Sequence, residues 1–217
     1  MALNIASFRE AVETKPVTLI AVTKQATIAQ IEEAFFSGIT EFGENKLQSA
    51  LAKKKELIPK IQAKLRWHFI GHLQRNKVKQ VIDNFELIHS VDTLSLAEQI
   101  SKTAGVEGKR QAILLQVKMT EDPNKFGFEP DDLRESFGKL NSLANIDIRG
   151  LMTITPAGSN SDICRKCFDG LRLLREELAA KHGAHLQELS MGMTDDWREA
   201  VECGATMVRL GRAIFGN

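Results

Sequence analysis

The sequence contains no tyrosine, so no phenol group can serve this chain as an acid, a base or a hydrogen-bonding contact. It also lacks an excess of either charge, since 29 basic and 28 acidic residues among 217 leave a net charge of +1. That balance gives no electrostatic footprint for nucleic acid or for an anionic membrane surface. No apolar run approaches the roughly 20 residues that span a bilayer. Neither nucleic acid nor a membrane is therefore expected among the partners.

Cysteine is scarce as well. Only three cysteines are present, and so small and odd a number argues against a disulfide framework. Residues 1–15 lack the basic segment followed by an apolar one that marks a signal peptide. Both absences predict a protein of a reducing compartment, the cytoplasm.

What the sequence does contain is a regular alternation of short apolar runs with longer amphipathic segments. The amphipathic segments begin at cap residues and end at glycines, as residues 27–38, 93–105 and 161–183 do. No linker or change of composition interrupts the pattern, so residues 1–217 are expected to form one domain. The candidate strands are residues 17–22, 40–44, 66–71, 86–91, 112–117, 148–153, 187–192 and 206–211.

Strands that alternate with helices pair in parallel, with each crossover helix packed behind the sheet. Eight such units close into a TIM barrel, whereas the open, doubly wound alternative usually carries a glycine-rich phosphate turn after its first strand. Here the first strand is followed by TKQATIAQ (23–30), which has no glycine. We therefore predict an α/β fold, a single TIM-type (β/α)8 barrel, with an extra helix in residues 1–15.

Lys24 stands directly after the first strand, in the stretch VTLIAVTKQ (17–25). Because lysine is rarely buried, it is either a rim residue in water or an amine at the mouth of a pocket. Catalytic and binding groups of TIM barrels lie at the C-terminal ends of the strands, which is where Lys24 falls. The architecture therefore favours the pocket.

The loops after the seventh and eighth strands have the composition of a phosphate site, which barrels of this type commonly build there. Ser190 and Gly192 close the seventh strand, and Arg209, Gly211 and Arg212 surround the end of the eighth. A hydroxyl, glycine backbone that a ligand can approach, and positive charge all favour an anion. A lysine amine facing that site can condense with an aldehyde to a Schiff base. Pyridoxal 5′-phosphate (PLP) carries both a phosphate and an aldehyde.

Eight motifs follow one another over nearly the whole chain. They are AVTK (21–24), FGEN (42–45), WHFIGHLQRNK (67–77), IHSVD (88–92), NKFGF (124–128), GLMTI (150–154), LSMGM (189–193) and GATMVRLGRAIFG (204–216). As a set they resemble the family of pyridoxal phosphate homeostasis proteins, known as YggS or PROSC, and the last block looks most like its cyanobacterial branch, PipY. The resemblance implies a barrel of the alanine racemase N-terminal-domain type, usually monomeric, that holds PLP as an internal aldimine.

The resemblance also implies roles for single residues. It assigns the Schiff base to Lys24, the pyridine nitrogen to Arg209, and a place near the lysine and ring to Asn45. A guanidinium donates hydrogen bonds but accepts none, so an arginine there keeps the pyridine nitrogen unprotonated and restrains carbanion chemistry.

The same resemblance implies that the phosphate is bound by Ser190, Gly192, Gly211 and the main chain of Arg212. Many relatives carry threonine at the position of Arg212, where a hydroxyl would reach the phosphate. In this chain the contact is made by the backbone alone or by the guanidinium, and both readings stay open.

The implied function is a PLP carrier in intracellular vitamin B6 homeostasis and, indirectly, in amino- and keto-acid balance, without efficient turnover. Such a carrier could pass PLP on to PLP-dependent apoenzymes. The alternative is an amino-acid racemase or a related PLP enzyme. Racemases of this barrel type place a tyrosine opposite the lysine as the second base, and this chain has none. A lysine Schiff-base aldolase is a third reading, but its lysine often sits on a later strand. No residue is nominated as catalytic.

A zinc-like spacing and several polar clusters complete the candidates. Cys164, Cys167, His182 and His185 imitate a zinc site, but Cys167 and His182 fall on one predicted helix, roughly 22 Å apart, so no metal is expected.

Four other polar or turn-forming features stand on either side of the third strand. His68 and His72 flank the end of that strand, where one of them could form a pocket wall and where a satisfied core or rim histidine is an equal reading. The cluster KKK (53–55) reads as a solvated helix face, residues 75–79 lie beside the mouth, and residues 124–128 form a turn that could close over the site.

Overall fold

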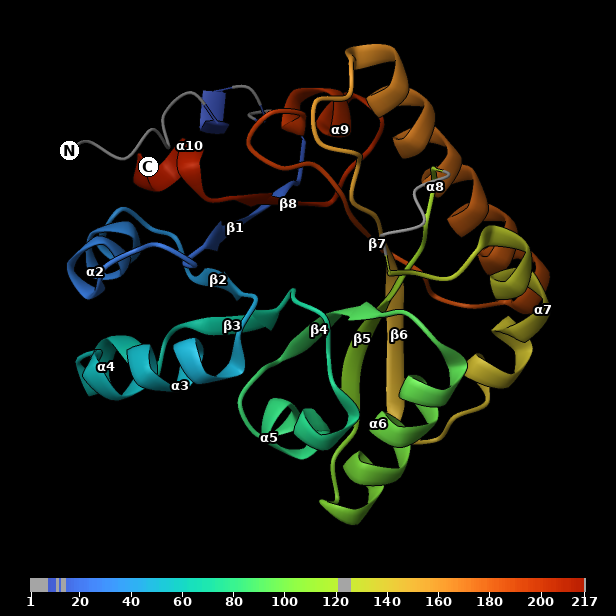
Figure 1. Ribbon diagram of the computed structural model, residues 1–217, viewed down its shortest axis with the longest axis horizontal. Coiled ribbons are helices and arrows are strands. Elements are labelled where there is room, and N and C mark those ends of the chain that lie inside the picture. Colours follow the sequence, from blue (N-terminus) through green and yellow to red (C-terminus); the bar gives the residue numbers. More distant parts are fainter. Residues whose placement is uncertain (1–7, 11, 13–14, 121–125, 217) are drawn as a thin grey trace.

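Eight parallel strands close into a barrel in sequence order (Figure 1). The computed structural model describes residues 8–10, 12, 15–120 and 126–216. The predicted TIM-type fold is confirmed, and each predicted strand is present with small differences at its ends. The strands are β1 (Thr18–Val22), β2 (Glu41–Glu44), β3 (Arg66–Phe69), β4 (Leu87–Val91), β5 (Gln111–Gln116), β6 (Ile146–Met152), β7 (Glu188–Ser190) and β8 (Met207–Leu210).

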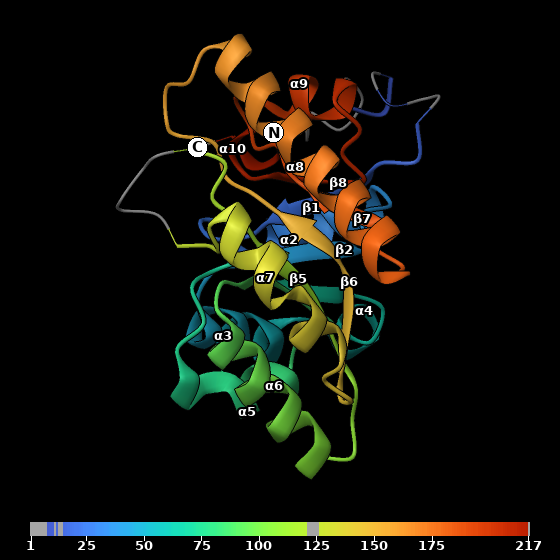
Figure 2. The ribbon, with the colours of Figure 1, turned by 90° about the vertical axis from the view of Figure 1, so that its right-hand side faces the viewer.

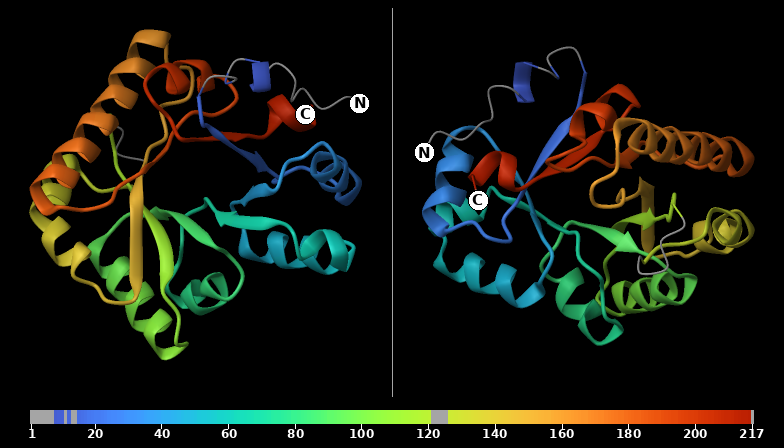
Figure 3. Two further views of the ribbon diagram at one scale, coloured as in Figure 1. Left: turned by 180° about the vertical axis from the view of Figure 1, so that it is seen from behind. Right: turned by 45° about the horizontal axis from the view of Figure 1, so that its top comes forward.

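Helices cover the outside of the barrel, as Figures 2 and 3 show from the side and from behind. Within the described part of the chain, none of them is long and apolar enough to cross a membrane. They are α2 (Ile28–Phe36), α3 (Leu47–Glu56), α4 (Pro59–Gln62), η1 (Arg75–Lys77), α5 (Val78–Ile82), α6 (Leu94–Val106), α7 (Pro130–Asn141), α8 (Ser161–His182), α9 (Trp197–Glu202) and α10 (Arg212–Phe215).

The helices begin and end at residues whose side chains or backbone suit helix termini. At the start of α2, the Gln30 N–H donates to Thr27 Oγ1 (3.3 Å) and the Thr27 N–H donates to Gln30 Oε1 (2.9 Å). This reciprocal pair is a capping box. The Asn160 side chain caps α8, which ends at Gly183 with φ of 59°, a left-handed conformation that favours glycine. Local sequence chemistry thus sets these boundaries.

Gly105 was predicted to end a helix, and that prediction is wrong. Helix α6 continues through Gly105 to Val106. A Cβ atom at Gly105 would lie 2.5 Å from Nδ2 of Asn145, which precedes β6. The glycine therefore allows close packing of the helix against the next unit of the barrel.

Side chains alternate between two apolar layers, because successive residues of a strand point to opposite faces. On β8, Val208 packs against the helices, while Met207 and Arg209 face the barrel interior with Ile20 of β1. The interior apolar layer is small, and several interior positions are polar. Its buried members are Ile20, Leu87, Ala112, Leu114, Met152 and Met207.

The predicted N-terminal helix is described only in part. Residues 8–10 are helical, and the Phe8 ring packs on Trp197 of α9 with ring centroids 5.4 Å apart. Val12 lies in a turn and Lys15 in a bend, so neither extends the predicted helix. Residues 1–7, 11 and 13–14, and residues 124–125 of the predicted turn at 124–128, lie outside the described residues. In the described part of the turn, the Phe128 N–H donates to the Gln116 carbonyl (2.8 Å), which ties the segment to β5.

Candidate functional site

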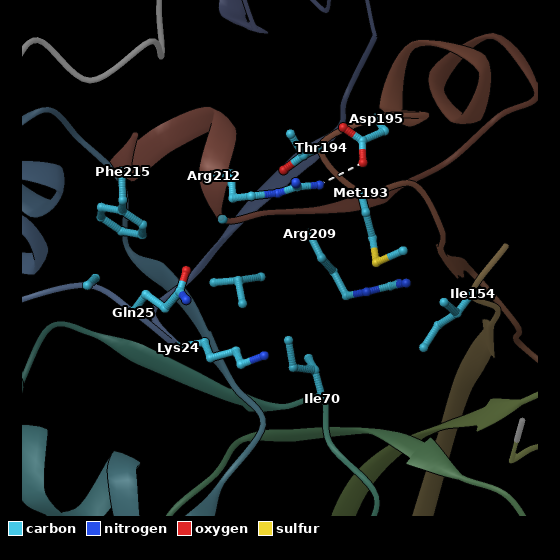
Figure 4. A pocket seen from close by; sticks show the side chains of 13 residues that line it. Lys24, Gln25, Ile70, Ile154, Met193, Thr194, Asp195, Arg209, Arg212 and Phe215 are labelled. Carbon is cyan, nitrogen blue, oxygen red and sulfur yellow. Dashed lines mark hydrogen bonds and ion pairs between the residues drawn. The ribbon is translucent and has the colours of Figure 1, made fainter. Parts of the chain in front are cut away.

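A cavity of about 360 Å³ opens at the C-terminal ends of the strands. This volume lies in the range of small-molecule sites. Figure 4 shows Lys24, from the end of β1, and Arg209, from β8, pointing into the same space. The cavity is lined by Val22, Lys24, Gln25, Ala26, Ile70, Ile154, Met193, Thr194, Asp195, Arg209, Gly211, Arg212 and Phe215.

Lys24 lies in a turn whose backbone is fixed although its side chain is exposed. The Ala26 N–H donates to the Thr23 carbonyl (2.9 Å), and the Thr23 hydroxyl donates to Glu44 Oε2 (3.0 Å). Glu44 is a fully buried carboxylate at the end of β2. The lysine amine therefore stays within reach of solvent and ligands while the chain that carries it is held to the neighbouring strand.

The buried Glu44 carboxylate is neutralised by Lys53 of α3, with Nζ and Oε2 2.7 Å apart and little of either side chain exposed. The prediction that residues 53–55 form a solvated face is therefore wrong for Lys53. Lys54 is also partly buried, over the ring of Trp67, and burial lowers its pKa to about 8. These lysines act in packing and charge balance rather than as a basic surface.

Arg209 is buried at the base of the cavity and held at two points. Its Nη1 donates to Ser190 Oγ (2.6 Å), and its Nη2 donates to the Thr153 carbonyl (2.9 Å). Burial lowers its pKa to about 10, with Asp196 opposing that shift. The guanidinium thus remains charged at neutral pH, and its orientation is set by β6 and β7.

Ser190 and Gly192 lie behind the cavity wall. The Ser190 hydroxyl is fully buried, facing Arg209 and Nδ1 of His89, which is 2.8 Å away. Gly192 has φ of 90°, and a Cβ there would lie 2.6 Å from Cβ of Ala200 in α9. The glycine is required by backbone conformation and by helix packing, and its carbonyl accepts the Arg209 N–H (3.0 Å).

Gly211 and Arg212 form the wall at the start of α10. Gly211 precedes the helix, where the first backbone N–H groups have no intrahelical acceptor. The Arg212 guanidinium pairs with the carboxylate of Asp195, with Nη2 and Oδ2 2.7 Å apart (Figure 4). Both side chains are exposed, so this ion pair lies at the rim and is accessible to solvent.

Asn45 follows β2 beside the Glu44 carboxylate. Its N–H donates to Glu44 Oε1 (3.0 Å). Its Oδ1 atom is buried, and the described residues offer it no hydrogen-bond partner. The cavity thus brings together Lys24, Arg209, Gly211 and Arg212, whereas Ser190, Gly192 and Asn45 do not line it.

Sequence reasoning missed most of the apolar lining and one charge. Ile70 follows β3 and Ile154 follows β6, so their positions after strand ends were the available signal. Phe215 ends α10, and no strand end marks it. Asp195 belongs to the sequence TDD (194–196) after β7, but that sequence does not indicate that Asp195 forms an ion pair with Arg212. Such pairings depend on how the loops fold back over the barrel.

The two histidines near the third strand have different surroundings. His68 points into the barrel interior, whereas His72 lies at the surface with Nδ1 3.3 Å from Asp92 Oδ2. The His72 ring stacks on Phe126, with centroids 3.9 Å apart. Neither histidine lines the cavity.

The zinc-like residues Cys164, Cys167 and His182 lie on the single helix α8, as predicted. No group of three or more histidine, cysteine or acidic side chains in the described residues is arranged to hold a metal ion. His185 follows the Gly183 that ends the helix. The helix therefore spreads these residues along its length, which is the reason given above for expecting no shared ion.

The family described as alanine racemase, N-terminal domain, matches residues 1–217. Among curated relatives, the pyridoxal phosphate homeostasis protein of Synechocystis sp. is 41% identical over 217 residues, which cover 97% of this chain and 96% of that one. The corresponding protein of Aquifex aeolicus is 40% identical over 199 residues, covering 92% and 86%.

Solved structures extend the likeness to three dimensions. PipY of Synechococcus elongatus PCC7942, solved with PLP bound, superposes with a TM-score of 0.91 at 40% identity and 98% coverage of both chains. An alanine racemase of Clostridium difficile 630 superposes with a TM-score of 0.78 at 16% identity. This chain spans only 56% of that racemase, and the likeness at that identity concerns the fold alone.

Proposed function

Since the chain belongs to the pyridoxal phosphate homeostasis protein family, we propose that it binds PLP as a Schiff base with Lys24 and holds it without efficient turnover. The observation that carries this proposal is the meeting of the Lys24 amine and the buried Arg209 guanidinium in one cavity at the strand ends. The amine offers the attachment point, and the guanidinium offers a fixed donor on the opposite wall.

The residues of the cavity fit the two ends of PLP. We assign the phosphate to Gly211 and the main chain of Arg212 at the start of α10, where free N–H groups favour an anion. Ser190 and Gly192, the other two residues predicted for the phosphate, lie behind the cavity wall, and the Ser190 hydroxyl is engaged with His89 and Arg209, so their support of that end would be indirect. The cofactor, when bound, supplies an aldehyde and a heteroaromatic ring. The apolar side chains of Ile70, Ile154 and Phe215, which line the cavity, would enclose the ring.

Turnover would be restrained by the same residues. A guanidinium that donates to the pyridine nitrogen leaves that nitrogen unprotonated, which weakens the ring as an electron sink. Asn45, which follows β2 and lies outside the cavity lining, would stand near Lys24 and the ring as the family resemblance implies. Racemisation needs two bases on opposite faces of the substrate, and the chain has no tyrosine to be the second. We propose a carrier role in PLP homeostasis, with the whole chain acting as one cytoplasmic, monomeric unit that passes PLP to apoenzymes.

The first test is to load the purified protein with PLP and to record its absorbance and its activity. We expect a visible band from the bound cofactor and racemisation of alanine far below the median enzyme turnover of about 10 per second. A protein that stays colourless at saturating PLP would contradict the binding proposal. Turnover near that median would instead favour the racemase alternative.

The rim ion pair predicts an effect on phosphate binding. Asp195→Asn should remove a negative charge beside the start of α10 and leave the Arg212 guanidinium available to an anion, which should tighten PLP binding by about two- to fivefold, because exposed charge interactions contribute up to roughly 1 kcal/mol. The gain should shrink as salt is added, since salt screens exposed charges. Equilibrium titration of PLP at two ionic strengths measures both effects.

Asp147→Asn is the matched control, since it removes the same charge from another exposed ion pair, with Arg149 on β6. It should leave PLP affinity unchanged. An unchanged affinity in Asp195→Asn as well would mean that Arg212 meets the phosphate through its backbone alone, which would decide between the two readings of that position.

A further inference from the structure

The barrel interior contains an unbroken line of five polar side chains, each from a different strand. Glu41 Oε2 lies 2.6 Å from His68 Nε2, and His68 Nδ1 lies 2.9 Å from His89 Nε2. His89 Nδ1 then lies 2.8 Å from Ser190 Oγ, which in turn accepts from Arg209 Nη1 (2.6 Å). All five residues are buried.

The two ends of the line determine which atom donates at every step. A carboxylate only accepts and a guanidinium only donates. Glu41 therefore accepts a hydrogen bond from the N–H at His68 Nε2. In a neutral ring this leaves His68 Nδ1 to accept a hydrogen bond from the N–H at His89 Nε2. His89 Nδ1 must then accept the Ser190 hydroxyl proton, and the Ser190 oxygen is left to accept from Arg209. One arrangement satisfies every donor and acceptor, and in it both imidazoles are neutral.

Burial favours the neutral form of both imidazoles. It lowers the pKa of His68 to about 4; Glu86 and Glu188 oppose that shift, and Arg66 and Arg149 add to it. The Glu41 carboxylate also faces the ring, 2.6 Å from Nε2.

His89 is surrounded more completely. Burial, with His68 and Arg209 beside it, lowers its pKa well below the usual value. A cationic imidazole at either place would put two donors where the line needs an acceptor. The directional arrangement is therefore the one that neutral rings permit.

The line joins two faces of the molecule. Glu41 is the first residue of β2 and borders a cavity of about 310 Å³ at the N-terminal ends of the strands, where Arg66 pairs with its other oxygen. Arg209 borders the cavity at the C-terminal ends. The strands between them run in parallel, so the line crosses the interior of the barrel from one end to the other.

We propose that Glu41, His68 and His89 are positioning residues for Arg209. They cause the Ser190 hydroxyl to donate its hydrogen bond to His89, so the Ser190 oxygen accepts from Arg209 and holds the guanidinium toward the cavity. If the Ser190 hydroxyl donated to another group, it could rotate away and leave Arg209 Nη1 without its acceptor. The role toward a bound ring rests on the proposed function. The hydrogen-bond direction itself does not.

The direction is tested in the protein without PLP by nitrogen NMR of the imidazole rings. With only five histidines in the chain, histidine-selective ¹⁵N labelling gives a simple spectrum. We expect His68 and His89 to be neutral, protonated on Nε2 alone, and unchanged between about pH 6 and pH 8, where ordinary histidines titrate. A proton on Nδ1 of either ring, or titration of either ring in that interval, would overturn the proposal.

Transmission along the line is tested with two carboxylate variants. Glu41→Gln removes the charge at the end of the line and should shift the ring signals of both His68 and His89. Glu188→Gln is the matched control, because Glu188 also acts on His68 by its charge but pairs with Thr206 outside the line. It should shift His68 only. If the ring signals of His89 do not shift in Glu41→Gln, Glu41 acts on His68 alone and the proposed transmission to His89 is wrong.

Positioning of Arg209 is tested at Ser190. Ser190→Ala should weaken PLP binding about tenfold, in keeping with loss of a hydrogen bond to a charged group, and Ser190→Thr should restore it because the hydroxyl returns. Weakening that threonine does not restore would contradict positioning through the hydroxyl. If the wild type shows the expected tautomers but binds no PLP, the proposed function is wrong and the hydrogen-bond direction is correct. If it binds PLP but shows other tautomers, the proposed function holds and the hydrogen-bond direction is wrong.

Discussion

Lys24→Ala should lose all covalently bound PLP while keeping its fold. The side chain is exposed, so its removal should change the free energy of unfolding by no more than about 0.5 kcal/mol. The amine is the only part of the site that can bond to an aldehyde carbon at that wall, and alanine has none. Borohydride reduction of PLP-loaded protein, followed by peptide mass mapping, should place the pyridoxyl group on the Lys24 peptide in the wild type and nowhere in the variant.

Lys46→Ala is a fitting control, since Lys46 is another exposed lysine and follows β2 at the same end of the barrel. It should keep full covalent loading. Should Lys24→Ala retain the visible band and the pyridoxyl mass on a different lysine, the assignment of the attachment point would be wrong. Melting curves of both variants, recorded without PLP, separate loss of attachment from loss of fold.

Lys53→Met should give the largest loss of stability among single changes near the site. It removes the cation that neutralises Glu44 and leaves a buried carboxylate without its charge partner, a change that costs about 3–5 kcal/mol. For a chain of this size, that loss corresponds to a fall in melting temperature of roughly 6–20 °C. Urea unfolding followed by circular dichroism measures the free energy directly.

Lys55→Met provides the comparison, because Lys55 lies two residues along the same helix and is exposed. Its effect should stay within about 0.5 kcal/mol. The double variant Glu44→Gln with Lys53→Met should recover part of the loss, since the uncompensated charge is gone. Equal stabilities of the Lys53 and Lys55 variants would mean that the Glu44 carboxylate does not depend on Lys53.

The order of the fold could be predicted because each strand carries its own signal. The all-buried runs of β4 and β5 read as apolar stretches, and Asn160 and Gly183 mark the two ends of α8. Alternation of strands and helices then leaves few possible topologies. Gly105 was misread because the same residue type serves helix ends and close packing, and only the neighbour Asn145 distinguishes the two.

The candidate site could be predicted only where a residue's place follows from the end of its strand. Lys24 and Arg209 reach one cavity because β1 and β8 are adjacent and their C-terminal ends lie together. The pairing of Lys53 with Glu44, by contrast, depends on how α3 folds back over β2.

Contacts through the barrel interior were harder still. His68 and His89 are 21 residues apart and touch only because the closed barrel brings the inward faces of β3 and β4 together. Alternation along a strand says that a side chain points inward, but the partner that it meets there depends on the tilt and stagger of all eight strands. No local pattern encodes that geometry.

The cavity lies across the seam at which the barrel closes. Strand β1 pairs with β8, with Ile20 opposite Arg209, although the two strands are separated by almost the whole sequence. A nascent or partly folded chain that has β1 to β7 in place would still present Lys24 without its opposite wall. Any ligand that bridges the two strands can bind only the closed ring, and it would stabilise that ring by mass action. Binding of PLP at the proposed site would then also stabilise the closed barrel, the last state reached in folding.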